Sequence, residues 1–131
     1  MTIHFNKAKH LYQKSEKTIA ETDDTLNIVK TMVKELKKSM NIVAINSNNK
    51  EKRIKRSKHF SKALVIIYTL QTSLDFEKGG DLATKLFQIY EYCRQQLIAD
   101  FRNKINTGIH KATKALEEIF SLNENGETGN V

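Results

Sequence analysis

The sequence predicts an all-α protein, an antiparallel up-down four-helix bundle, and two observations support this fold class. The chain of 131 residues contains no proline and only five glycines, whereas sandwiches, barrels and doubly wound folds need such residues in their many turns. Apolar residues also recur at the three- and four-residue steps of amphipathic helices. The length suits one compact domain, which we place at residues 1–122.

The most regular helix is expected at about residues 24–46. Its apolar side chains alternate at steps of three and four, so they fall on one face of a helix. Thr22, Asp23 and Asp24 precede this stripe and are suited to cap the N–H groups of the first turn. The polar run 46–49 ends the helix. The stripe consists of Leu26, Val29, Val33, Leu36, Met40 and Val43, with Ile28, Met32 and Ile45 beside it.

A second helix is expected at about residues 51–75. Residues 64–68 make its middle apolar nearly all round, so we expect this helix to be central or covered by a partner. Gly79 and Gly80 follow, and they are suited to the left-handed backbone conformations of a chain reversal. The stripe of this helix consists of Phe60, Ala63, Ile67, Leu70 and Leu74.

The third and fourth helices are expected at about residues 81–102 and 103–122. Gly108 lies in the fourth helix, where it costs ~1 kcal/mol relative to alanine and weakens the first turn. We expect residues 123–131 to be a disordered tail and residues 3–12 to be a short, mobile amphipathic segment. The third helix carries Leu82, Leu86, Ile89, Cys93 and Leu97, with Ala83, Phe87, Tyr90 and Phe101 beside them, and the fourth carries Ile105, Ile109, Ala112, Leu116 and Ile119.

Basic residues are concentrated in one segment. Of the net charge of +7, residues 50–62 contribute +6, from seven basic residues and one acidic residue. Lysine outnumbers arginine 18 to 4, whereas bidentate contacts to phosphate and guanine favour arginine. We therefore interpret the segment as a solvated loop and helix start and predict no nucleic-acid partner. The alternative is a basic bundle that binds nucleic acid or an anionic surface through residues 50–62.

No pattern in the sequence predicts catalysis, a cofactor or a metal site. The four histidines have no second ligand at helical spacing, and neither a phosphate-binding glycine loop nor a Glu-x-x-His motif is present. Cys93, the one cysteine, lies on an apolar stripe, where a thiol packs as a small hydrophobe. We predict that the protein is not an enzyme.

The sequence also predicts no membrane insertion. The longest apolar run, residues 63–68, is far shorter than the ~20 residues of a membrane span. The first residues lack the charged region and apolar core of a secretory signal. Together with the single cysteine, these observations favour a cytoplasmic location.

Apolar residues exceed what four single-stripe helices need, because the second and third helices carry almost two stripes each. Periodicity alone leaves two interpretations open. The surplus is buried in a central helix pair or a structural homodimer, or it forms a groove that binds another amphipathic helix.

The segment SLDFEKGGDLATKLFQIYEY, residues 73–92, resembles the hallmark of the flagellin-specific export chaperones, the FliS family. In that family a Leu-Asp, a Glu-Lys-Gly-Gly turn and a Leu-Tyr-x-Tyr-like stretch follow in this order. Residues 61–70 resemble the family's Lys-Ala-x-x-Ile-Ile-x-x-Leu helix, and the resemblance extends to about residue 122. The matching residues are Asp75, Glu77, Lys78, Gly79, Gly80, Ala83, Leu86, Tyr90, Tyr92 and Leu97.

This resemblance implies a non-enzymatic chaperone of the bacterial cytosol. Such a protein holds the C-terminal segment of flagellin, prevents premature polymerisation and assists delivery to a component of the flagellar type III export gate. We hypothesise that residues 3–12 occupy part of the binding groove until the client displaces them. The candidates for partner binding are Ile3, Phe5, Leu11, Tyr12, Leu26, Val29, Val65, Tyr68, Phe87 and Tyr90.

Overall fold

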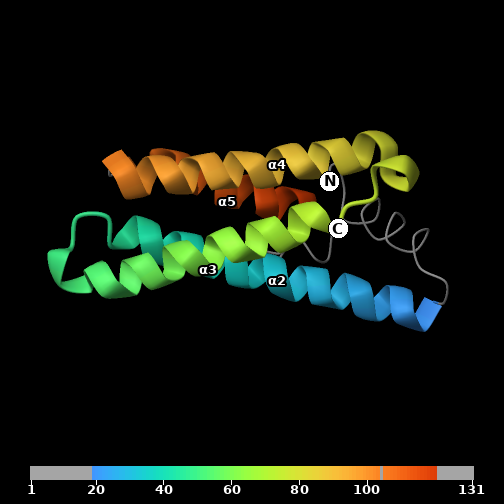
Figure 1. Cartoon of the computed structure of the whole chain (residues 1–131), viewed down its shortest axis with the longest axis horizontal. Coiled ribbons are helices and arrows are strands. Elements are labelled where there is room, and N and C mark those ends of the chain that lie inside the picture. The colour runs from blue at the N-terminus through green and yellow to red at the C-terminus, as the bar shows by residue number, and fades with distance from the viewer. Residues whose placement is uncertain (1–18, 104, 121–131) are drawn as a thin grey trace.

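Long helices lie side by side in residues 19–103 and 105–120, the part of the chain that the structure, a computed structural model, describes (Figure 1). This part contains no strand, and the all-α prediction is confirmed. Residues 3–12 and 123–131, which the sequence analysis singled out, lie outside it. The elements are α2 (Ile19–Ile45), the short 3-10 helix η1 (Lys50–Lys52), α3 (Arg53–Thr72), α4 (Phe76–Asn103) and α5 (Thr107–Phe120).

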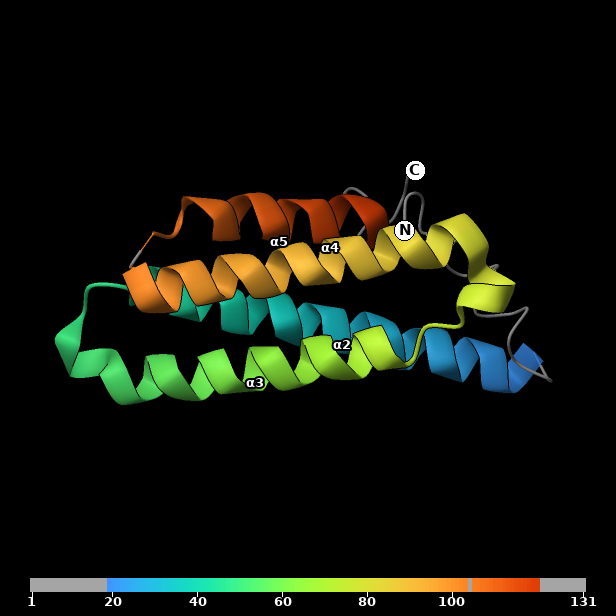
Figure 2. The same cartoon turned by 45° about the horizontal axis from the view of Figure 1, so that its top comes forward.

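The four α-helices form a closed ring, because each packs against its neighbours in sequence and α5 also packs against α2. Figure 2 shows the four helices lying lengthwise along the bundle.

Contacts between neighbouring helices show the direction in which each helix runs. Lys62 of α3 donates to Glu35 of α2 at 2.9 Å, and the rings of Phe60 in α3 and Phe101 in α4 stack with centroids 4.0 Å apart. Further along α2, Ser39 pairs with the earlier residue His59 of α3, and further along α3, Gln71 pairs with the earlier residue Glu91 of α4. Figure 2 shows α5 running back along α4. Successive helices are therefore antiparallel, which confirms the four-helix bundle.

The predicted stripes form the core. All six stripe residues of α2 are buried, and the predicted stripes of the other helices supply most of the remaining core. Four residues assigned to the stripes or their flanks are exposed: Ile28, Ile45, Phe87 and Ile105. Ile28 and Ile45 lie beside the stripe of α2 and face away from the other helices. The core residues with no more than 1% exposure include Leu36, Met40, Ile67, Leu70, Leu86, Tyr90, Cys93, Leu97, Ile109, Leu116 and Phe120.

Helix α2 begins earlier than predicted and ends where predicted. Its first residue is Ile19, so Thr22, Asp23 and Asp24 belong to the helix and do not precede it. The polar run after Ile45 ends the helix by binding its last carbonyl groups. Asn46 Nδ2 donates to the Ile42 carbonyl at 2.9 Å, and Ser47 Oγ donates to the Ala44 carbonyl at 2.9 Å.

The reversal between α3 and α4 comes before the glycine pair. The chain turns at residues 73–75, and α4 begins at Phe76, five residues earlier than predicted. The Asp75 side chain caps this start, because its Oδ1 accepts from the Lys78 N–H at 3.0 Å. Gly80 then kinks α4 with a φ of 51°, a conformation that favours glycine. The glycine pair thus bends a helix and does not reverse the chain.

Helix α5 begins at Thr107, four residues later than predicted, so Ile105 lies outside it and is exposed. Gly108 occupies its first turn, next to α4. A Cβ atom built at Gly108 would collide with the side chain of Gln96. A larger residue at position 108 would require the flexible Gln96 side chain to move aside.

Candidate functional site

Apolar side chains are exposed along α3 and α4. Val65 and Tyr68 of α3 are 64% and 69% exposed, and Phe76 and Phe87 of α4 are 48% and 38% exposed. The two phenylalanine rings meet edge to face, with centroids 5.9 Å apart. We call these four residues the α3–α4 apolar surface. Large exposed apolar side chains on two neighbouring helices are typical of an interaction site.

Polar side chains border this surface and join the two helices. Gln71, three residues after Tyr68 and thus on the same side of α3, donates to the carbonyl of Phe87 at 3.4 Å and to Glu91 at 3.2 Å. Arg94 binds the Glu91 carboxylate at 2.6 Å. The Arg94 hydrogen bond lowers the pKa of Glu91 to about 2, although burial opposes this shift. The polar border is thus ordered and ionised at neutral pH.

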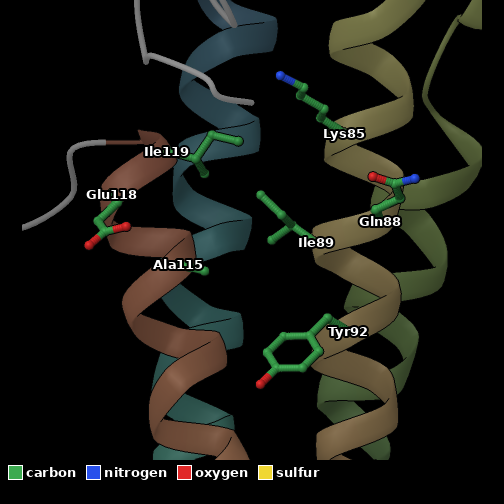
Figure 3. A pocket seen from close by; sticks show the side chains of 7 residues that line it. All are labelled: Lys85, Gln88, Ile89, Tyr92, Ala115, Glu118 and Ile119. Carbon is green, nitrogen blue, oxygen red and sulfur yellow. The ribbon is translucent and has the colours of Figure 1, made fainter.

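A second apolar feature lies on the other side of α4. A groove of about 380 Å³ separates α4 from α5, lined by Lys85, Gln88, Ile89, Tyr92, Ala115, Glu118 and Ile119. Figure 3 shows Ile89 and Tyr92 projecting from α4 toward α5, with Ile119 opposite them. Apolar atoms line most of this groove, and Lys85 and Glu118 place one charge of each sign at its border. Such grooves accept the apolar face of an amphipathic helix.

The structure separates the ten predicted binding residues into three groups. Val65, Tyr68 and Phe87 are exposed and belong to the α3–α4 apolar surface. Leu26, Val29 and Tyr90 are buried in the core, so in this structure they support the bundle and offer a partner no surface. The remaining four, Ile3, Phe5, Leu11 and Tyr12, lie outside the described residues.

The second predicted helix is expected to be central or covered by a partner. The exposure of Val65 and Tyr68 rules out the central position and leaves cover by a partner open. Helix α3 is neither central nor covered along this side by the other described helices, because in a ring of four helices each has an outward face.

Sequence periodicity did not predict the groove between α4 and α5. Tyr92 and Ala115 supply part of its lining, and neither residue stood out by its spacing.

The basic segment is only partly a solvated surface. Arg56 is 7% exposed, and its Nη2 donates to Asp100 Oδ1 and to the Asp100 carbonyl, both at 2.9 Å. Asp100 is fully buried and also accepts from Ser47 Oγ at 2.6 Å. The guanidinium carbon of Arg56 lies 4.7 Å from the centre of the Phe101 ring. The prediction of a wholly solvated segment is therefore wrong at Arg56, which links α3 to α2 and α4.

Other residues of the basic segment also have partners within the bundle. Lys62 pairs with Glu35, and the Ser39 hydroxyl lies within hydrogen-bond distance of His59 Nδ1, at 3.1 Å. Partial burial, together with Lys62, Lys55 and other lysines nearby, lowers the pKa of His59. The side chain is therefore neutral at physiological pH and adds no positive charge to the segment.

Cys93 is fully buried, and burial raises the pKa of its thiol to about 12. Because only the thiolate reacts, the shift lowers the reactive fraction by about a thousandfold at neutral pH. We predict that a thiol reagent labels Cys93 of the native protein far more slowly than in denaturant, as followed by the absorbance of the released thiolate. Rapid labelling of the native protein would contradict the burial of this residue.

Among the described residues, no group of three or more histidine, cysteine, aspartate or glutamate side chains is arranged to hold a metal ion. The helices in the same ranges lack the combined length and apolar composition that crossing a membrane demands.

A four-helix bundle with exposed apolar side chains and an apolar groove is typical of proteins that bind helical segments of other chains. The family comparison makes this class specific. The chain belongs to the family of the flagellar protein FliS, whose family model matches residues 7–123. FliS proteins are chaperones of flagellar assembly and export and are not known as enzymes. No curated protein and no solved structure matches the chain.

The residues that carry the family resemblance have structural roles in the described fold. Asp75 caps the start of α4, and Gly80 forms its kink. Ala83, Leu86, Tyr90 and Leu97 are core residues of α4. The resemblance therefore rests mainly on residues that form the bundle, and much less on the surfaces that would contact a partner.

Proposed function

We propose that the protein binds the C-terminal segment of flagellin in the bacterial cytosol, prevents premature polymerisation of flagellin and assists its delivery to the flagellar type III export gate. Membership of the FliS family supports the client. The observation that carries the mode of binding is the apolar side chains on both sides of α4: the α3–α4 apolar surface and the groove toward α5.

The physical reason lies in the client. A segment that becomes helical only in the filament has an apolar face without a partner in the monomer. A helix laid across α4 would cover that face and the exposed aromatic rings of the chaperone together. Coupled folding and binding of this kind buries about 1,000–3,000 Å², which is more than the groove alone offers and favours the use of both sides of α4.

Co-purification tests the proposal. We expect flagellin to co-purify with the chain in a one-to-one ratio and to lose the interaction when its C-terminal segment is deleted. Because the contacts are mainly apolar, binding should persist as salt is raised. The same one-to-one mixture should suppress seeded growth of flagellin filaments, measured by sedimentation. Flagellin without its C-terminal segment serves as the matched control for binding.

The alternatives predict different outcomes. A nucleic-acid site in residues 50–62 would give binding that falls steeply as salt rises, because phosphate contacts release counterions. Arg56 and Lys62 pair with acidic residues of the bundle, so two of the seven basic residues in the segment are less available to follow a nucleic-acid backbone. A purely structural homodimer would show a dimer mass in light scattering and no dependence on flagellin. Either result, without flagellin binding, would refute the proposal.

A further inference from the structure

A small pocket lined by polar and charged residues lies at the turn between α2 and α3. The C-terminal end of α4 lies at the same end of the bundle (Figures 1 and 2). The volume of the pocket is about 90 Å³, enough for several water molecules or for one small polyatomic ion. The turn that forms it is held by hydrogen bonds. Asn49 Oδ1 accepts from the Glu51 N–H at 3.1 Å, and Ser47 Oγ donates to the Ala44 carbonyl.

The lining of this pocket is strongly cationic. It includes the side chains of Lys50, Arg53 and Arg56, together with those of Asn46, Asn48 and Asn49. None of these described lining residues is acidic. Asp100, which lies buried in the bundle, neutralises one of the positive charges through its ion pair with Arg56. The lining therefore keeps a charge of about +2, and the side-chain amides of Asn48 and Asn49 add hydrogen-bond donors, whereas Asn46 Nδ2 already donates to the Ile42 carbonyl.

The buried arginine is incompletely satisfied. Nη2 of Arg56 donates twice to Asp100, but Nε, which is also buried, has no hydrogen-bond acceptor among the described residues. A guanidinium is always charged and presents its donors in a rigid fork. Arg56 also lines the pocket, and a buried donor without a partner on a lining residue indicates that an acceptor from outside the chain, such as water or an anion, completes its hydrogen bonding.

We propose that this pocket binds a phosphate group. A phosphate monoester carries a charge of about −1.5 to −2 at neutral pH, which matches the excess charge of the lining, whereas a carboxylate carries only one negative charge. The oxygens of a phosphate group accept hydrogen bonds from several directions. One group can therefore bind donors on Arg53, Arg56 and the asparagines at the same time. The source is free phosphate or a phosphomonoester. This site lies away from the client surfaces, and the proposal does not depend on flagellin binding.

The test is a titration of the full chain at constant ionic strength, with chloride replaced by inorganic phosphate. We expect a saturable shift of the Arg56 Nε–H signal in nuclear magnetic resonance spectra and a rise in the melting temperature. A parallel titration with O-phosphoserine separates the two sources. Binding of phosphate alone assigns the site to the free ion, and binding of both assigns it to phosphomonoesters as well. No saturable shift with either compound overturns the proposal.

A matched pair of variants controls for general electrostatics. Arg53→Gln should weaken phosphate binding by about tenfold or more, because it removes a charge-assisted hydrogen bond. Lys58→Gln removes the same charge from an exposed position of α3 outside the pocket and should change the affinity by less than about twofold. Equal losses in both variants, or acetate binding as tightly as phosphate, would overturn the assignment.

Discussion

Replacing Asp100 with alanine is expected to lower the free energy of unfolding by about 3–5 kcal/mol, because it leaves the Arg56 guanidinium buried without its counter-ion. Asp100 is fully buried and binds both Arg56 and Ser47. Water does not compensate for the lost partner, since Arg56 is itself only 7% exposed. Urea denaturation followed by far-ultraviolet circular dichroism measures the change.

Asp81→Ala provides the control for this prediction. It makes the same substitution in the same helix, but at an exposed residue, so the loss should stay below about 1 kcal/mol. A loss in Asp100→Ala no larger than in this control would contradict the network. A second comparison separates the unpaired charge from lost packing: the double variant Arg56→Met with Asp100→Leu should recover most of the stability, because it removes both charges.

The stripes of α2 show why the bundle was predictable from the sequence. Leu26, Val33 and Val43 recur at spacings that only a helix places on one face, and no competing turn residues interrupt them. A stripe of this kind must be buried against neighbours, and the short links between helices leave an antiparallel bundle as the simple solution. Helix ends were less predictable, because local capping decides them. Asp75, a capping residue, starts α4 before the glycine pair.

The buried ion pair was missed although its spacing carries a signal. Arg56 lies four residues before Phe60, and Asp100 lies three residues after Leu97, so each extends a stripe by about one turn. A stripe was identified by its apolar residues alone, so a charged residue at the next buried position was not recognised as part of it. Burial of these charges depends on the pairing of two helix ends 44 residues apart, and no local pattern encodes that pairing.

The candidate site was predictable in its chemistry but not in its extent. Sequence indicated an apolar surplus on the second and third predicted helices, and the structure places part of it, Val65, Tyr68 and Phe87, at the surface. Periodicity did not distinguish these residues from Leu26, Val29 and Tyr90, which are buried. Exposure depends on the angle at which each helix faces its neighbours, and that angle is a property of the assembled ring.

Phe87→Ala is expected to weaken binding of the flagellin C-terminal segment by about 30-fold, since an aromatic anchor at the centre of an interface typically contributes 2 kcal/mol or more. Phe87 lies on α4 in the α3–α4 apolar surface, and its ring contacts that of Phe76 edge to face. Loss of this edge-to-face contact costs the bundle only about 0.5–1.5 kcal/mol, so the variant should remain folded. Isothermal titration calorimetry with the isolated segment measures the affinity.

Ile45→Ala is the matched control for Phe87→Ala. Ile45 is a large apolar residue with 76% exposure, greater than that of Phe87, but it lies at the end of α2, away from the α3–α4 apolar surface. If apolar exposure alone attracted the client, Ile45→Ala would weaken binding at least as much as Phe87→Ala. We expect no measurable change in Ile45→Ala, because the client needs neighbouring aromatic side chains and not scattered apolar ones. If Phe87→Ala binds the flagellin segment with the same affinity as the unsubstituted protein, the client lies elsewhere on the bundle.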